Sequence, residues 1–171
     1  MEMRWISGVS RGRLGLISVM LAATSLSACV QTAPEEAMSF AAPPMQWDHH
    51  PQAEEWTEST LVALSTKDPI LSEHVPADIE SWCPGYAEAP VEERRAFWAG
   101  LLSAVARYES TWNPAASGGG GRWIGLMQIS PRSAANYGCE ATSVNALKDG
   151  EQNLECAVEI MSTQVAKDGM V

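Results

Sequence analysis

Residues 90–109, PVEERRAFWAGLLSAVARYE, constrain the fold most strongly, because they carry the clearest helical pattern in the chain. Pro90 suits the first turn of a helix, and Glu92 and Glu93 favour the N-terminal end of its dipole. Apolar side chains then recur at helical spacing, at Phe97, Leu101, Leu102, Val105 and Tyr108. The sequence therefore predicts one long amphipathic helix over this segment.

Three further segments carry helical signals. Residues 54–66 have a helical pattern, and SPRSAANYG reads as a short helix with Ser130 as N-cap, Pro131 at the first position and Gly138 as the stop. Residues 149–167 place apolar side chains on one face, namely Leu154, Ala157, Val158, Met161 and Val165. No strand-like alternation or repeat stands out, so a mainly α-helical fold is expected.

The N-terminus has the features of an export signal. Three arginines precede the apolar run LGLISVMLAATSL, which is too short to span a bilayer comfortably. The run ends in LSAC, which resembles a bacterial lipobox and implies a signal peptide over residues 1–28 and a lipid on Cys29. Val30, where an inner-membrane lipoprotein has Asp, implies a periplasm-facing anchor in the outer membrane. The alternative is an ordinary signal peptide cut near Ala28.

Residues 29–55 contain several prolines among Ala, Glu and Gln, a composition typical of a flexible tether. His49 and His50 lie within it and are interpreted as solvated, because no second cluster with zinc-ligand spacing exists. The folded domain is expected over residues 56–171, without metal or cofactor.

Three cysteines follow the export signal. Cys139 and Cys156 bracket a short polar loop and are predicted to pair in an oxidising compartment. Cys83 is then left over, which means a free thiol, an intermolecular bridge or a missing partner.

The net charge of −10, from 11 Lys and Arg against 21 Asp and Glu, argues against nucleic acid as a partner. Within this acidic chain Glu109 is isolated, because no other Asp or Glu occurs between it and Cys139. On a helical wheel that starts at Phe97, Glu109 falls at about 120°, inside the apolar arc. A carboxyl in apolar surroundings has a raised pKa and can donate a proton. The alternative is a helix-end glutamate that turns to water.

The residues around Glu109 carry a resemblance to a known family. The segment that begins at Glu109 contains the motifs ES and NP, then the glycine run, then GLMQIS. Together these motifs resemble the catalytic signature of soluble lytic transglycosylases, the lysozyme-like enzymes that cleave peptidoglycan. The resemblance implies a mainly α, lysozyme-like domain with a glycine-rich loop beside the cleft. It makes Glu109 the catalytic acid and places four residues along the sugar cleft: Ser110, Ser117, Met127 and Gln128. Trp123 is a further candidate for stacking on sugar rings.

The resemblance also implies a mechanism with one carboxylate. In this family a single Glu protonates the oxygen between N-acetylmuramic acid and N-acetylglucosamine, and then takes a proton from the C6 hydroxyl. That hydroxyl closes a 1,6-anhydro ring, so no positioned water is required. Ordinary glycosidases use two carboxylates instead.

Two other functions stay open. A hydrolase related to goose-type lysozyme would need a second acid, for which the sequence offers distant residues such as Asp149. A non-catalytic peptidoglycan-binding lipoprotein would agree with the absence of the family's AYN motif before Val171. That absence and the unpaired Cys83 favour a missing C-terminal stretch. In each case the expected partner is a peptidoglycan glycan strand.

Overall fold

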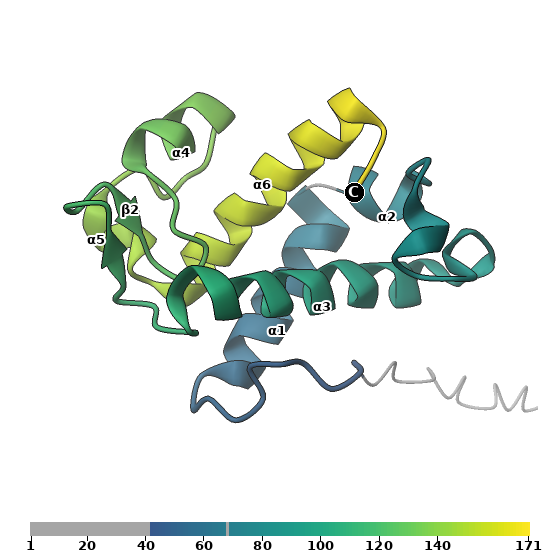
Figure 1. Ribbon diagram of the computed structural model, residues 1–171, viewed down its shortest axis with the longest axis horizontal. Coiled ribbons are helices and arrows are strands. Elements are labelled where there is room, and N and C mark those ends of the chain that lie inside the picture. Colours follow the sequence, from purple (N-terminus) through teal and green to yellow (C-terminus); the bar gives the residue numbers. More distant parts are fainter. Residues whose placement is uncertain (1–41, 68) are drawn as a thin grey trace, which may run out of the picture. The chain divides into compact units, whose positions relative to one another are not determined.

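The computed structural model describes residues 42–67 and 69–171, and the prediction of a mainly α-helical fold is confirmed (Figure 1). The α-helices are α1 (Ala53–Val62), α2 (Ile70–Glu73), α3 (Val91–Ser110), α4 (Pro131–Tyr137), α5 (Val144–Leu147) and α6 (Gly150–Asp168). A π-helical turn η1 (Ala63–Lys67) extends α1, and the 3-10 turns η2 (Ile79–Ser81) and η3 (Tyr86–Glu88) precede α3. One antiparallel hairpin joins β1 (Ser117–Gly118) to β2 (Trp123–Ile124).

Local capping explains where the later helices begin and end. Ser130 accepts a hydrogen bond from the Ser133 amide at the start of α4, as predicted, and Gly138 ends that helix with a φ of 80°. Asp149 caps α6 in the same way, through the amide of Gln152. These side chains satisfy amides that would otherwise lack partners at a helix start, while glycine adopts the left-handed conformation without strain.

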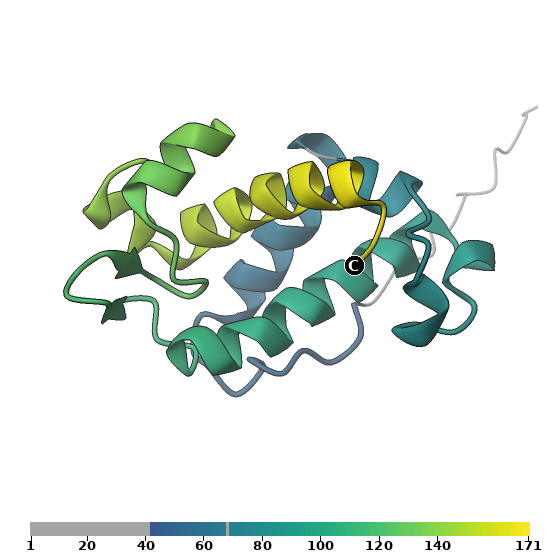
Figure 2. The ribbon, with the colours of Figure 1, turned by 45° about the horizontal axis from the view of Figure 1, so that its top comes forward.

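The helices pack around α3 and α6. Helix α6 contacts α1, α2, α4 and α5, and α3 contacts α1 and α2. Figures 1 and 2 show the β-hairpin beside the C-terminal end of α3, with α4 and α5 close to it, whereas α2 lies toward the other end of α3. The hairpin and the end of α3 therefore face each other across one part of the domain.

The buried face of α3 differs from the predicted one. Its fully buried residues include Trp98, Ala99, Leu102 and Ala106, whereas Tyr108 is 84% exposed. Phe97 and Leu101 are only partly buried. Small residues dominate this face because neighbouring helices approach it closely, so the largest apolar side chains are a poor guide to its centre.

The chain is packed against the core well before residue 56. Met45 and Trp47 are buried, and the Trp47 amide donates to the hydroxyl of Ser103 at 3.1 Å. His50 is not a solvated linker residue, because it is half-buried and its ring stacks on Trp56, whereas His49 is exposed and contacts Trp112 through one edge-on ring contact. The tether predicted for residues 29–55 therefore does not extend over residues 45–55.

The predicted signal peptide and Cys29 lie outside the described residues. Within residues 42–67 and 69–171, no helix is long and apolar enough to cross a membrane. The same residues contain no cluster of His, Cys, Asp or Glu that could hold a metal ion.

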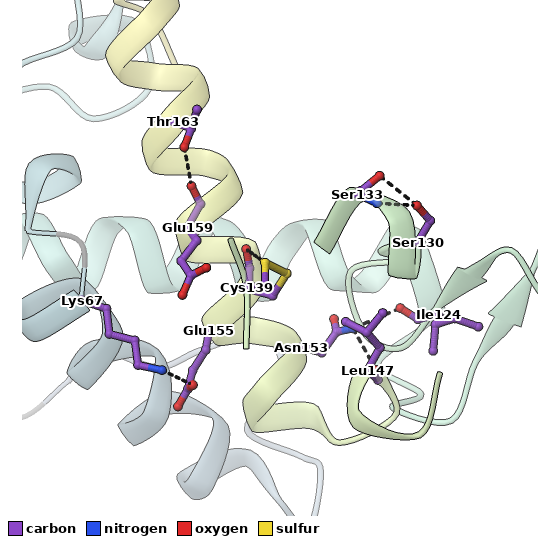
Figure 3. Close-up of a disulfide and its surroundings, with 11 residues drawn as sticks. Lys67, Ile124, Ser130, Ser133, Cys139, Leu147, Asn153, Glu155, Glu159 and Thr163 are labelled. Carbon is purple, nitrogen blue, oxygen red and sulfur yellow. Dashed lines mark hydrogen bonds and ion pairs between the residues drawn. A yellow bond between two sulfur atoms is a disulfide. The ribbon is translucent and has the colours of Figure 1, made fainter. Parts of the chain in front are cut away.

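A disulfide and an ion pair tie other segments of the domain to α6 (Figure 3). The predicted disulfide between Cys139 and Cys156 joins the segment after α4 to α6. Lys67 at the end of η1 donates to Glu155 at 2.6 Å, and this hydrogen bond raises the pKa of the Lys67 ammonium. Cys83 is a free, half-buried thiol.

Replacing both bridged cysteines, as Cys139→Ala and Cys156→Ala, should lower the free energy of unfolding by about 3 kcal/mol, because the bridge restricts the unfolded chain. Urea unfolding would measure this loss. Reductant should lower the urea midpoint of the wild type and leave that of the double variant unchanged. A Cys83→Ser variant should respond to reductant as the wild type does, and equal midpoints for wild type and double variant would contradict the prediction.

Candidate active site

A cavity of about 430 Å³ opens beside the C-terminal end of α3. Its lining combines the end of that helix with the hairpin and the turn that follows, through Glu109, Gly118, Gly119, Trp123, Met127 and Gln128. We call it the Glu109 cavity. Four of these lining residues were candidates from the sequence: Glu109, Trp123, Met127 and Gln128. They line one cavity although they are up to 19 positions apart in the chain.

Glu109 is exposed, and the expectation that its side chain points into the core is wrong. On the helical wheel Glu109 falls between Trp98 and Leu102, which are both fully buried, so its position around the helix does not account for its exposure. Glu109 instead lies in the last turn of α3, one residue before the helix ends at Ser110, and it lines the cavity. The carboxylate therefore meets the solvent in the cavity rather than the apolar interior.

The end of α3 is fixed by its packing. Thr111 and Trp112 both adopt positive φ angles, 54° and 56°, and stop the helix directly after Ser110. The Trp112 indole donates to the carbonyl of Ser103 at 2.9 Å and packs against His49. Trp112 is therefore part of the supporting structure, and it holds the turn that carries Glu109.

The opposite wall is a tight turn between Ile124 and Ile129, which exchange backbone hydrogen bonds of 2.9 and 3.1 Å. Gln128 has a φ of 48° at this turn, and its side-chain amide donates to the Gly125 carbonyl at 2.9 Å. These contacts fix the orientation of the amide in the wall of the cavity.

Asn153 of α6 anchors this turn through its side chain (Figure 3). Its side-chain oxygen accepts from the Met127 amide at 2.8 Å, and its nitrogen donates to the carbonyls of Ile124 and Leu147. Asn153 is fully buried. Gly125 allows this approach, because a Cβ there would collide with the Leu147 carbonyl and the Asn153 amide.

The glycine-rich segment forms the tip of the hairpin, an element that sequence analysis missed. Strands of two residues are too short to show alternation, and the glycines between them carry no side-chain pattern. Gly118 and Gly119 are needed for close contact, because a Cβ on the first would meet the Gln128 side chain and one on the second the Trp123 indole. The predicted glycine-rich loop beside the cleft is thus present.

Ser110 and Ser117 do not line the cavity. The Ser110 hydroxyl donates to the Ala106 carbonyl within α3 at 3.2 Å. Ser117 is exposed on β1, where it pairs with Ile124.

Comparisons with known proteins show the family of the chain. The family model described as the transglycosylase SLT domain matches residues 89–169. A solved structure of DslA with glutamine in place of one glutamate is 31% identical, with a TM-score of 0.70, and the match covers 76% of this chain and 77% of that one. The chain belongs to the transglycosylase SLT family.

Two further DslA structures, a second variant of this kind and the wild-type protein, match this chain with the same identity and coverage and TM-scores of 0.69. No curated protein sequence matches the chain. The lysozyme-like fold of the SLT family agrees with the helical arrangement described above. SLT domains are of the lytic transglycosylase type, and their substrate is the peptidoglycan of the bacterial envelope.

An Asn153→Ala variant should lose about 2–3 kcal/mol in the free energy of unfolding, because it leaves the Met127 amide and two carbonyls buried without their partner. Urea unfolding would measure the loss. Asn136→Ala on the exposed side of α4 is the matched control and should change stability by less than about 0.5 kcal/mol. Equal effects of the two substitutions would show that the Asn153 contacts do not support the turn.

Proposed function

We propose that this chain is a peptidoglycan lytic transglycosylase that cleaves the β-1,4 bond between N-acetylmuramic acid and N-acetylglucosamine and forms 1,6-anhydro-N-acetylmuramic acid. One observation carries the proposal. Glu109 is the single acid among the described residues that line its cavity, and Met127, Gln128 and Trp123 line the same cavity. The lining thus offers one carboxyl group for proton transfer and an aromatic ring beside it.

The proposed reaction needs only this carboxyl group. Glu109, as the acid, donates its proton to the bridging oxygen while the bond from that oxygen to C1 of the muramic residue breaks. The C6 hydroxyl of the same residue attacks C1 and gives its proton to the Glu109 carboxylate. The acid is regenerated and no water is consumed. The tethered hydroxyl gains the entropic advantage of an intramolecular nucleophile.

Binding of the sugar would prepare the acid. Glu109 is exposed, so water reaches its carboxyl group. A pyranose ring that fills the cavity displaces this water, so the proton transfer takes place away from bulk solvent. Trp123, which is 40% exposed, offers a ring face to the sugar, and the fixed amide of Gln128 offers hydrogen bonds.

A hydrolytic mechanism has less support. Asp149 caps α6 by accepting from the Gln152 amide at 3.1 Å and does not line the Glu109 cavity. An inverting hydrolase places its two carboxyl groups roughly 6.5–9.5 Å apart so that water fits between the second group and the sugar. A non-catalytic peptidoglycan-binding protein would not need an acid that faces the bound sugar.

We also propose that residues 1–28 direct export and that Cys29 carries the lipid of an outer-membrane anchor, with the domain facing the periplasm. The disulfide between Cys139 and Cys156 supports an oxidising compartment. Residues 30–41 would then act as the tether between the lipid and the segment that packs against the core from Met45 onward.

The test compares Glu109→Gln with the wild type, both without residues 1–29, in the digestion of purified peptidoglycan. The wild type should release fragments that end in anhydro-muramic acid, identified by mass spectrometry. Glu109→Gln should be slower by a factor of about 10² to 10⁴, because glutamine cannot transfer the proton. Glu93→Gln, an exposed position in the first turn of α3, should match the wild type.

Three outcomes would contradict the proposal. Fragments with reducing muramic ends would show that water attacks C1 and would favour the hydrolase. Equal cleavage by the wild type and Glu109→Gln would exclude Glu109 as the acid. Binding to peptidoglycan without any cleavage would instead favour the non-catalytic protein.

A further inference from the structure

A second cavity, of about 660 Å³, opens along the N-terminal half of α3. Its lining combines that helix with the segment after η2 and with the start of the described chain, through Pro43, Trp82, Cys83, Phe97 and Leu101. We call it the Trp82 cavity. Figures 1 and 2 show the turns before α3 at the N-terminal end of that helix, away from the β-hairpin. The Trp82 cavity shares no lining residue with the Glu109 cavity, so the two can be occupied independently.

The Trp82 cavity presents an apolar surface to the solvent. Trp82 is 54% exposed, and Phe97 and Leu101 are only partly buried. The Trp82 indole donates to Oδ2 of Asp78 at 3.1 Å, and the Phe97 ring packs edge-on against Tyr86 at 5.4 Å between ring centroids. Both exposed rings are therefore held in place by their neighbours. An exposed apolar surface of this kind is typical of a site that meets a protein or a membrane.

The place where the chain enters the domain favours the membrane as the partner. Pro43, which lines the Trp82 cavity, is the second residue of the described chain. Residues 30–41 separate Cys29 from Ala42, and a chain of that length spans at most about 45 Å. The proposed lipid on Cys29 would therefore keep the Trp82 cavity close to the bilayer. Tethering raises the effective concentration of the surface, so that even a weak apolar contact with it is populated.

The charges around the cavity select the class of lipid. Glu93 lines the cavity, and none of the described residues that line it is Lys or Arg. Asp78 and Glu80 precede Trp82 in the chain, which has a net charge of −10. Anionic headgroups repel such a surface. Zwitterionic headgroups do not, and the ammonium group of phosphatidylethanolamine can pair with Glu93.

We propose that the surface around the Trp82 cavity docks on the zwitterionic phospholipid surface of the membrane that carries the lipid anchor. This inference rests on the proposed lipid on Cys29 and not on the proposed reaction. The Trp82 indole enters the headgroup region, which suits a side chain with an apolar ring and a polar N–H. Phe97 and Leu101 lose contact with water on docking. The Glu109 cavity stays open to the glycan strand, because it has separate walls.

The test attaches the protein to vesicles of phosphatidylcholine and phosphatidylethanolamine through a histidine tag in place of residues 1–29 and a nickel-chelating lipid. Cys83 reports docking, because it is a free thiol that lines the Trp82 cavity. Its reaction with a charged, water-soluble maleimide should be about tenfold slower on these vesicles than on vesicles without the chelating lipid. This factor corresponds to a cavity that is covered for about 90% of the time. Vesicles of phosphatidylglycerol with the chelating lipid should give no such protection.

Two variants show which surface docks. Trp82→Glu places a charge at an exposed position, and its Cys83 should react at the same rate with and without the chelating lipid. Tyr108→Glu is the matched control, because Tyr108 is 84% exposed near the other end of α3 and does not line the cavity. Its Cys83 should be protected as in the wild type.

A second readout covers the case in which Trp82→Glu fails to fold. Brominated acyl chains should quench part of the tryptophan emission of the attached wild type, and Trp82→Phe should remove this quenching. Equal maleimide rates for the attached and unattached wild type would overturn the inference, as would full protection in folded Trp82→Glu. Protection that needs no chelating lipid and grows with protein concentration would also overturn it, because a second copy would then cover the cavity.

Failure of this test is distinct from failure of the proposed function. The histidine tag replaces the natural lipid, so the result does not depend on whether Cys29 is lipidated, which mass spectrometry of the whole protein would show. The products formed from peptidoglycan test the proposed reaction separately.

Discussion

The side chain of Asn153 is the contact on which the candidate site depends most. It is fully buried, and it joins α6 to the Met127 amide and to the carbonyls of Ile124 and Leu147. A buried side-chain amide that makes all these hydrogen bonds specifies one position of the turn relative to α6. Any shift of the turn would leave buried polar groups without hydrogen-bond partners. The turn that faces Glu109 is therefore placed by the helical core and not by the exposed hairpin.

The acid itself has the opposite environment. Glu109 is exposed, but the turn after it is held by the Trp112 indole, which donates to Ser103, and by His49 from the N-terminal segment. The same Ser103 accepts the Trp47 amide. Residues 45–49 thus contribute to the position of Glu109 although they were expected to form a tether. An exposed acid on a rigid support can meet its substrate without the cost of ordering a loop on binding.

The sequence predicted α3, α4 and α6 well, because capping residues and helical periodicity are local signals that residues such as Ser130 and Gly138 carry directly. The prediction of which face of α3 is buried was wrong. Close packing of helices selects Ala99 and Ala106 over larger neighbours for this face, and hydrophobic periodicity does not report the distance between helices. The residues of the cavity wall could be named from motifs. The role of Asn153 could not, since a single polar residue in a helix gives no signal of what lies opposite.

The isolation of Glu109 has a physical rationale beyond proton transfer. Peptidoglycan carries carboxylates on its peptide stems, and the chain has an acidic balance of −10 that repels them at long range. The segment from Ser110 to Cys139 contains Arg122 and Arg132 but no acid, and it supplies all of the Glu109 cavity except Glu109 itself. A second carboxylate would add repulsion where the strand must approach. An intramolecular nucleophile removes the need for a second carboxylate. The proposed chemistry and the charge distribution therefore both favour a cavity with a single carboxyl group.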